Sequence, residues 1–186
     1  ISPKKSINNL ILFTDEKFNT NHIRNYVSST EFSYIRDLLK TNDLSKNLLA
    51  FELSSKKKII LVSIKNNLSN SIIENIGAEL FKSINYGKST EYIINTNSIK
   101  TKNENFIGHL LHGLKLKSYE FNKYKSKRET RIITINVLGN KNKPSIKSQL
   151  KFKALEEGTF YTRDLVSEPG NILHPDEYAK RLRTLK

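Results

Sequence analysis

Short runs of Ile, Leu and Val alternate along this chain with longer segments in which apolar residues recur every three or four positions. The first pattern predicts buried strands, and the second predicts amphipathic helices. Strands and helices in alternation, with one hairpin at 48–64, favour a layered α/β sandwich with a mixed, partly parallel sheet flanked by helices. The expected strands are 9–13, 48–53, 58–64, 92–94 and 131–138.

Polar residues at the helix starts refine the expected helices. Ser71 and Glu74 have the spacing of a capping box, and they would open a helix whose apolar face includes Ile76 and Leu80. Gly77 in the same segment indicates a close contact with a neighbouring element. The expected helices begin near residues 29, 71, 105 and 145.

A polar loop at 139–144 separates the last strand from the longest helix, and it is the clearest boundary in the chain. Gly158 in this helix has no side chain to hold a neighbour away, so we expect a packing partner there. The side chains near one face of the helix are Leu155, Thr159, Thr162 and Val166.

Prolines mark the end of the long helix and the start of another. Pro169 pushes the residue before it out of the α region, and Gly170 follows. Pro175 suits the first turn of a new helix, where its missing N–H would have no partner anyway. Arg163 and Asp164 are neighbours, so their side chains diverge around the helix and we expect each to reach a different partner.

The formal net charge of +14 is typical of proteins that bind nucleic acid. Lys far outnumbers Arg, however, and Arg is the residue that phosphate-reading sites favour. The chain contains no Cys, which excludes a disulfide scaffold and a thiolate zinc site. It has no apolar run long enough to span a membrane. It begins with Ile1 and contains no Met, so we expect a segment of a longer protein.

Two local patterns allow other functions. Residues 115–131 are rich in Lys and contain three aromatic residues, an arrangement that can hold single-stranded nucleic acid by stacking. The same aromatic residues could instead pack into the core while the Lys side chains face water. The three residues are Tyr119, Phe121 and Tyr124.

The second pattern is a pair of histidines. His109 and His112 lie three positions apart on the expected helix 105–116, a spacing at which two imidazoles can share one metal ion. Two ligands are too few for a metal site, so packed or surface positions are favoured. His22 and His174 stand alone, and the same interpretation applies to them.

Residues 163–179, RDLVSEPGNILHPDEYA, resemble the segment that joins the two domains of the leucyl (cytosol) aminopeptidase family. Enzymes of this family have a helix ending in Ala-Arg-Asp-Leu-Val-Asn, then a Pro–Asn turn and a Pro-led helix. The chain departs from this pattern at Thr162, Ser167 and His174. The matching residues are Arg163, Asp164, Leu165, Val166, Pro169, Asn171, Leu173, Pro175 and Ala179.

A second stretch supports the resemblance. SYEFNKYKSK at 118–127 is similar to a Tyr-x-Phe-Asp-x-Tyr-Lys stretch that follows a helix in the family's N-terminal domain. KIILVSIK at 58–65 is a weaker match, because Ser63 and Lys65 stand where the family often has glycines.

The resemblance implies a macro-domain-like N-terminal domain and, after the joining helix, a catalytic domain with two divalent metal ions, Mn or Zn. In such enzymes a metal-bridged water attacks the peptide carbonyl. The family's metal ligands lie in a motif that this chain lacks, so no catalytic, metal-binding or cofactor-binding residue is carried over. The 7 glycines are scattered, which disfavours a phosphate loop for ADP-ribose.

The resemblance also implies a domain organisation. Residues 1–143 would be the N-terminal α/β domain, 144–168 the joining helix, and 169–186 the start of the catalytic domain. The chain would contribute architecture, oligomer assembly or regulation to a cytoplasmic, homohexameric aminopeptidase that acts on peptides and has no membrane partner. A basic nucleic-acid-binding α/β module is the alternative.

Overall fold

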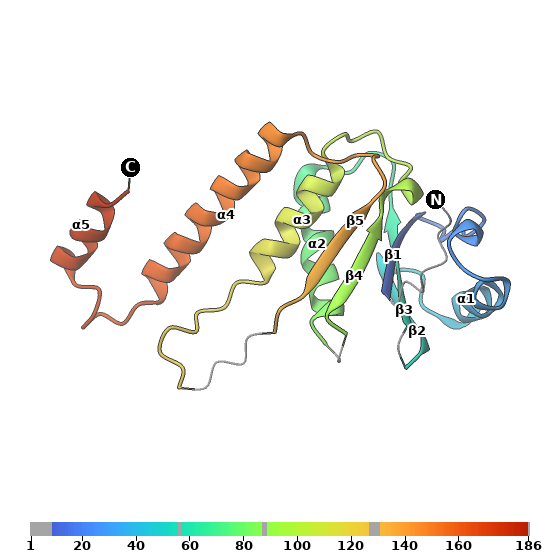
Figure 1. Cartoon of the computed structure of the whole chain (residues 1–186), viewed down its shortest axis with the longest axis horizontal. Helices are drawn as coiled ribbons and strands as arrows, with labels where there is room; N and C mark the ends of the chain where they lie inside the picture. Colours follow the sequence, from blue (N-terminus) through green and yellow to red (C-terminus); the bar gives the residue numbers. More distant parts are fainter. Residues whose placement is uncertain (1–8, 56, 87–88, 127–130, 186) are drawn as a thin grey trace.

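Five strands form one sheet in the order β2-β3-β1-β4-β5 (Figure 1). β2 runs antiparallel to β3, and every other neighbouring pair is parallel, which confirms the predicted mixed, partly parallel sheet. The strands are β1 (Asn9–Asp15), β2 (Leu48–Ser54), β3 (Lys57–Ile64), β4 (Glu91–Asn95) and β5 (Thr134–Leu138). The computed structural model describes residues 9–55, 57–86, 89–126 and 131–185.

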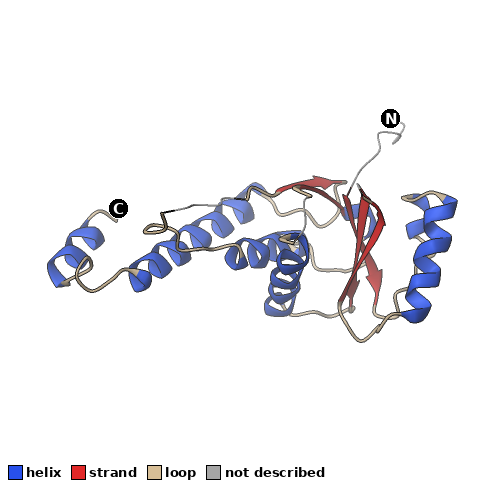
Figure 2. Ribbon diagram, turned by 90° about the horizontal axis from the view of Figure 1, so that it is seen from below, coloured by secondary structure: helices blue, strands red, loops and turns tan. Residues whose placement is uncertain are grey.

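Helices cover both faces of the sheet (Figure 2). α1 lies on one face, α2 and α3 lie on the other, and α4 and α5 extend away from the sheet beyond α3. The helices are α1 (Ser29–Thr41), α2 (Asn70–Ile84), α3 (Phe106–Lys117), α4 (Ile146–Ser167) and α5 (Pro175–Arg183). Two short 3-10 turns, η1 (Ile23–Asn25) and η2 (Thr96–Ser98), lie in the connections.

The central strand β1 supplies side chains to both cores, because successive residues of a strand point to opposite faces. Leu10 and Leu12 belong to the core under α1, whereas Ile11 and Phe13 belong to the core under α2 and α3. Burying such a side chain fully contributes roughly 1.5–3 kcal/mol, so the two cores hold the sheet between its helical layers.

Two glycines bring α2 and α3 into backbone contact. A Cβ placed on Gly77 would lie 2.0 Å from the carbonyl oxygen of Leu110, which confirms the predicted close contact. Gly113 meets α2 in the same way, with its Cβ position 1.9 Å from the carbonyl oxygen of Glu74. The two helices can approach this closely only because neither glycine carries a side chain.

The predicted capping box of α2 is wrong. Ser69, two residues earlier, caps the helix by accepting from the backbone N–H of Ile72. Ser71 lies in the first turn, and Glu74 contacts His109 of α3 instead of the helix start. A true capping box occurs at α1, where Ser28 is the N-cap and Glu31 is its partner.

β5 is shorter than the predicted strand 131–138. β4 begins at Glu91, whose partner in β5 is Thr134, so residues 131–133 have no partner in β4. Arg131 is used differently: its guanidinium donates to the backbone carbonyls of Asn85 and Ser89, which follow α2.

The face of α4 that carries Leu155 and Val166 was expected to pack on the domain, but another face of the helix does so. Leu155 and Val166 are 47% and 81% exposed, and no described atom lies within 4 Å of the Cβ position of Gly158. The expected packing partner at Gly158 is therefore not found among the described residues. Within the same residues, no helix combines the length and the apolarity that a membrane crossing requires.

Candidate functional site

The two stretches that carry the family resemblance contact each other in the structure. The loop 118–124 follows α3 and packs on the C-terminal half of α4. The hydroxyl of Tyr119 donates to Oδ1 of Asp164 at 2.8 Å, and the Tyr119 ring lies 5.2 Å from the ring of Phe160. We call this loop, the last two turns of α4 with Glu168 after them, and the α5 residue Arg181 the junction.

Arg163 and Asp164 make hydrogen bonds to different partners, as predicted, but both side chains also contact Tyr119. Nη1 of Arg163 donates to the backbone carbonyl of Leu116 at 2.6 Å, and the guanidinium lies 5.4 Å from the centre of the Tyr119 ring. Asp164 accepts the Tyr119 hydroxyl from the neighbouring side of the helix. Together the two side chains fix the end of α3 and the loop after it against α4.

Glu168 is the charged centre of the junction. Its side chain is only 1% exposed, and it accepts from Lys123, from the Tyr124 hydroxyl and, at 2.9 Å, from Nη1 of Arg181. Arg181 in turn donates through Nε to Glu177 at 3.0 Å. Because Glu168 directly follows α4 and its partners come from the loop and from α5, one carboxylate links three segments of the chain.

The charges around Glu168 change its acidity. Hydrogen bonds from the Lys123 ammonium and then from the Tyr124 hydroxyl are the largest causes, and they lower the pKa of Glu168 to about 2. The same contact raises the pKa of Lys123. The contacts at the junction therefore stabilise the ionised form of the Glu168 carboxylate.

The turn between α4 and α5 follows the sequence prediction. α4 ends at Ser167, and the backbone carbonyl of Pro169 accepts from the N–H groups of Ile172 and Leu173, both at 2.9 Å. Pro175 occupies the first turn of α5, as predicted. His174 is the N-cap residue, but its side chain makes no capping hydrogen bond.

His109 and His112 do not share a ligand position. Nδ1 of His109 lies 2.8 Å from Glu74, whereas Nδ1 of His112 lies 3.1 Å from Glu156 of α4. The ring of Phe152 contacts both imidazoles, at 5.0 and 5.2 Å between ring centres. The two histidines thus help to pack α2, α3 and α4.

The described residues offer no metal centre, since they contain no group of three or more His, Asp and Glu side chains that could hold an ion. His22 is likewise engaged with the backbone, because its Nε2 lies 2.7 Å from the carbonyl oxygen of Phe13.

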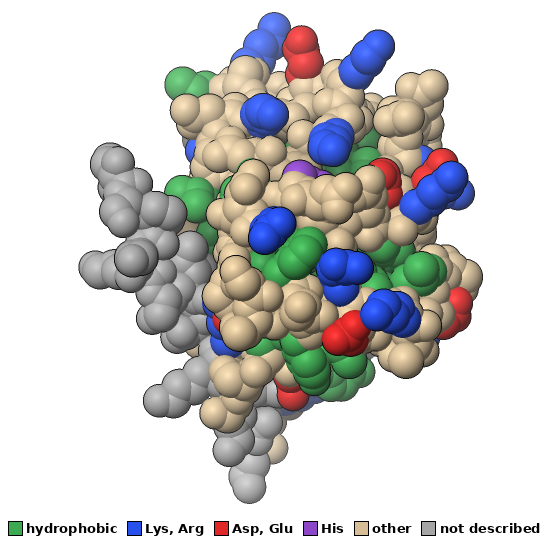
Figure 3. All heavy atoms as spheres, turned by 90° about the vertical axis from the view of Figure 1, so that its right-hand side faces the viewer, with side chains coloured by type: hydrophobic (Ala, Val, Ile, Leu, Met, Phe, Trp, Pro, Cys, Tyr) green, Lys and Arg blue, Asp and Glu red, His purple; other side chains and the backbone are tan. Residues whose placement is uncertain are grey.

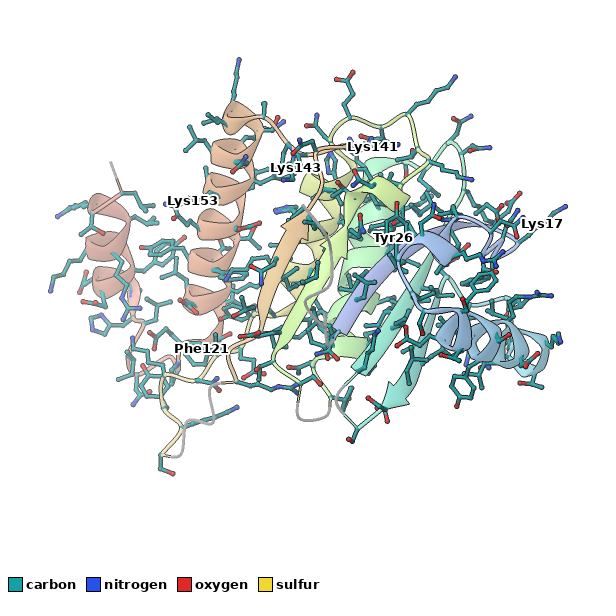
Figure 4. All side chains as sticks on the ribbon, turned by 45° about the vertical axis from the view of Figure 1, so that its right-hand side comes forward. Lys17, Tyr26, Phe121, Lys141, Lys143 and Lys153 are labelled. Atoms are coloured by element: carbon teal, nitrogen blue, oxygen red, sulfur yellow. The ribbon has the colours of Figure 1, made fainter. Side chains whose placement is uncertain are left out.

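The aromatic residues of the basic stretch 115–131 all contact residues of the junction, although Tyr124 remains 51% exposed. The hydroxyl of Tyr119 is bound to Asp164 of α4, and that of Tyr124 to Glu168 directly after α4. The ring of Phe121 packs on that of Tyr124 at 5.8 Å. Figure 4 shows Phe121 in the loop after α3. Residues 127–130 of the stretch lie outside the described residues. On the α1 side of the molecule, basic side chains are spread among acidic ones (Figure 3).

Two of the cavities that border the junction share residues of the loop after α3. One of about 430 Å³ lies between the loop, α4 and α5, and the other, of about 730 Å³, lies between the ends of α2 and α3, β5 and α4. Glu120, Asn122 and Asp164 line both cavities. The sequence patterns did not identify Glu120, Asn122 or Glu168 as functional residues. Glu168 does lie directly before the predicted turn, and a carboxylate that becomes buried there needs positively charged partners.

Comparison with known proteins places the chain in a family. The profile of the "Cytosol aminopeptidase family, N-terminal domain" matches residues 15–128. The chain is 30% identical over 135 residues to a cytosol aminopeptidase of Rickettsia prowazekii, a match that covers 68% of this chain and 27% of the relative. It is 38% identical over 90 residues to a probable cytosol aminopeptidase of Clostridium perfringens, with 44% of this chain and 18% of the relative covered.

Solved structures agree on the fold. A mutant of tomato leucine aminopeptidase superimposes with a TM-score of 0.75 at 15% identity, over 98% of this chain and 40% of that chain. The bottromycin maturation enzyme BotP in complex with Mn gives a TM-score of 0.65 at 15% identity, over 96% of this chain and 36% of that chain. The chain thus spans less than half the length of each of these four proteins. From its sequence and its fold, the chain belongs to the cytosol aminopeptidase family and corresponds to the family's N-terminal domain.

Proposed function

We propose that this chain is the non-catalytic N-terminal part of a two-metal leucyl aminopeptidase that removes N-terminal residues from peptides. Residues 1–143 form its α/β domain, 144–168 its joining helix, and 169–186 the beginning of the catalytic domain. The chain contributes the architecture that holds the catalytic domain. The family match and the fold support this assignment.

The junction is the observation that carries the proposal. Glu168 lies at the end of α4, and its partners Lys123 and Arg181 belong to the N-terminal domain and to α5. α5 is therefore held in a fixed direction relative to the domain that precedes it. Because α5 is fixed, a catalytic domain that follows it would also have a fixed orientation relative to the N-terminal domain. Such a fixed orientation is what we mean by an architectural role.

The metal ions of the parent enzyme belong to the catalytic domain in this proposal. The described residues hold no suitable group of ligands, so Mn or Zn would be bound by residues that follow α5. BotP, which is similar in fold, is described in complex with Mn, and this supports a divalent metal in the parent. We also propose that the parent enzyme is a homohexamer in the cytoplasm and that its substrates are peptides.

Hydrolysis of leucine p-nitroanilide tests the proposal. The purified chain, with Mn²⁺ or Zn²⁺ added, is expected to release no p-nitroaniline above the buffer rate. A cytosol aminopeptidase assayed in parallel is the positive control. Metal-dependent turnover by the chain itself, abolished by a chelator, would overturn the assignment.

A second test examines the parent. The coding sequence downstream of Lys186 is expected to encode a carboxylate-rich motif with Asp and Glu metal ligands and a Lys. A downstream sequence that encodes no such motif would show that the segment serves a different protein.

A further inference from the structure

One edge of the sheet has no neighbouring strand in the part of the chain that the structure describes. β2 stands first in the strand order, so only β3 pairs with it (Figure 1). The backbone N–H of Ser63 donates to the carbonyl oxygen of Asn47 at 2.8 Å, so the odd-numbered residues of this segment face β3. The N–H and C=O groups of Leu48, Ala50 and Glu52 therefore point away from the sheet.

This edge lacks the usual protection against pairing. Natural edge strands are commonly protected by Lys, by Pro, by a bulge or by a covering segment. Residues 48–52 contain neither Lys nor Pro, and the register shift toward β3 comes only between Glu52 and Ser54. Ala50 is exposed, and no backbone hydrogen bond among the described residues reaches the outward groups. An open run of this kind is a template for another strand.

The charge of this region favours a second copy of the chain as the partner. The whole chain carries +14, so two copies repel each other across most of their surface. Residues 28–54, which include α1 and β2, hold four acidic and three basic side chains, a net charge of −1. The acidic residues are Glu31, Asp37, Asp43 and Glu52, and the basic residues are Arg36, Lys40 and Lys46.

Figure 3 agrees with this count, because basic and acidic side chains are interspersed on the α1 side of the molecule. Two copies can therefore approach each other at this edge with little repulsion.

An antiparallel pair of β2 strands centred on Ala50 satisfies the open edge. Leu48 of each copy would lie opposite Glu52 of the other, and the two Ala50 residues would face each other, so the copies exchange about six backbone hydrogen bonds. Centring the pair on Glu52 would place two like charges opposite each other, which is unfavourable. Centring it on Leu48 would leave Glu52 opposite Leu44, which lies outside the strand.

The same register continues the apolar core from one copy to the other. Leu49 and Phe51 belong to the core under α1, and both are buried. In the pair centred on Ala50, Leu49 of each copy lies opposite Phe51 of the other, in a non-hydrogen-bonded pair whose side chains approach closely. The strand is thus complementary to itself on both faces, as a two-fold interface requires.

We propose that β2 forms an interface between two copies of this chain, in which the two sheets join edge to edge into one continuous sheet. A single strand pair buries less surface than the roughly 1,200 Å² of a stable complex, so we expect weak dimerisation of the chain, with a Kd of about 0.1 mM. The interface lies in the α/β domain and does not depend on the activity proposed for the parent enzyme.

Sedimentation equilibrium of the whole chain, up to about 0.5 mM protein in about 0.15 M salt, measures the dimer. Ala50→Lys puts two ammonium groups opposite each other, and Ala50→Glu does the same with carboxylates, so each is expected to weaken the dimer at least about tenfold. An equal mixture of the two variants is expected to recover the dimer as a one-to-one pair, because opposite charges then face each other.

Asn136→Lys is the matched control, since Asn136 is an exposed residue of β5 and the substitution adds the same charge. This control is expected to leave the dimer unchanged. Circular dichroism of each variant verifies that the fold is retained.

Cross-linking tests the register directly. The chain contains no Cys, so Ala50→Cys introduces a single thiol. Residues of a hydrogen-bonded pair have Cα atoms about 5.5 Å apart, a separation that a disulfide can span. Under mild oxidation Ala50→Cys is expected to form a covalent dimer at least about tenfold faster than Asn136→Cys.

The proposal is overturned if the chain stays monomeric at the highest concentration, which would leave a strand of a different protein as the occupant of the edge. It is also overturned if Ala50→Lys dimerises as strongly as the unsubstituted chain, if mixing the two charged variants recovers no dimer, or if Ala50→Cys cross-links no faster than its control. None of these outcomes involves the hydrolysis assay, so failure of the interface and failure of the proposed parent activity can be told apart.

Discussion

The hydroxyl of Tyr119 donates to Oδ1 of Asp164 at 2.8 Å, although the two residues are 45 positions apart in the sequence. Each residue lies in one of the two stretches that resemble the cytosol aminopeptidase family. Their contact joins the two stretches in one interface: one stretch supplies the loop, and the other supplies the helix on which the loop docks. A change in either stretch is therefore expected to affect the same interface.

Tyr119→Phe tests this contact. The substitution removes the hydroxyl but keeps the ring that packs on Phe160, so the expected loss in the free energy of unfolding is about 1 kcal/mol. Urea denaturation followed by circular dichroism measures it. Tyr34→Phe on α1 is the control, because Tyr34 is 49% exposed, and it should change stability little. Equal effects of the two substitutions would show that the Tyr119–Asp164 bond contributes nothing specific.

Glu168→Gln should change how stability depends on pH. The pKa of Glu168 is lowered from 4.5 to about 2 in the folded protein, so its ionised form stabilises the fold above the unfolded pKa. That contribution is lost as the pH falls from about 4.5 through about 2, when the carboxylate is protonated. The variant lacks it at every pH, so the stability difference from the parent chain should shrink in acid.

Denaturant titrations between pH 7 and pH 2 provide the measurement for Glu168. Glu157→Gln serves as the control, since Glu157 is 68% exposed and makes only a long 3.8 Å contact with Lys153. A difference between parent and Glu168→Gln that stays constant over the whole pH range would contradict the role assigned to the buried carboxylate.

Nucleic-acid binding can be tested by gel shift with short single-stranded DNA. At about 0.15 M salt we expect no discrete complex, because the hydroxyls of Tyr119 and Tyr124 are bound to Asp164 and Glu168 and the remaining attraction is non-specific. Smearing that disappears as salt is raised fits this expectation. A sharp, salt-resistant complex would favour the basic-module alternative.

The strands and helices of this fold could be predicted because their signals are local. Apolar alternation and spacing fixed the strands to within a few residues, and the prolines fixed the turn between α4 and α5. The errors occurred where two local solutions were possible. Ser69 and Ser71 can both cap a helix; in the structure Ser69 is the cap, and Glu74, the expected partner of Ser71, contacts His109 instead.

The candidate site was harder to predict because its residues come from distant segments. Glu168 gave no local signal, since its partners Lys123 and Arg181 lie before and after it in different elements. The packing face of α4 was also hidden, because Phe152 and Phe160 make its contacts with rings of α3 and of the loop after it, while more regularly spaced residues face outward. Such pairings depend on the docking of α4, which periodicity alone does not describe.

The close approach of α2 and α3 yields the sharpest prediction for stability. In Gly77→Ala and Gly113→Ala the new Cβ would lie 2.0 and 1.9 Å from backbone oxygens of the facing helix. Backbone cannot rotate away as a side chain can, so the helices must separate, at an expected cost of about 3 kcal/mol or more. Gly158→Ala is the matched control within a helix.

At Gly158 nothing described lies within 4 Å of the new methyl group, so alanine should stabilise the protein by up to about 1 kcal/mol through its higher helix propensity. Thermal and urea unfolding of the three variants provide the comparison. Destabilisation by Gly158→Ala as large as that by Gly77→Ala would mean that α4 is covered at this position in solution. We expect Gly77→Ala and Gly113→Ala to lower stability and Gly158→Ala to raise it. That result would show that the tight contact lies between α2 and α3, and that the face of α4 at Gly158 is open to solvent.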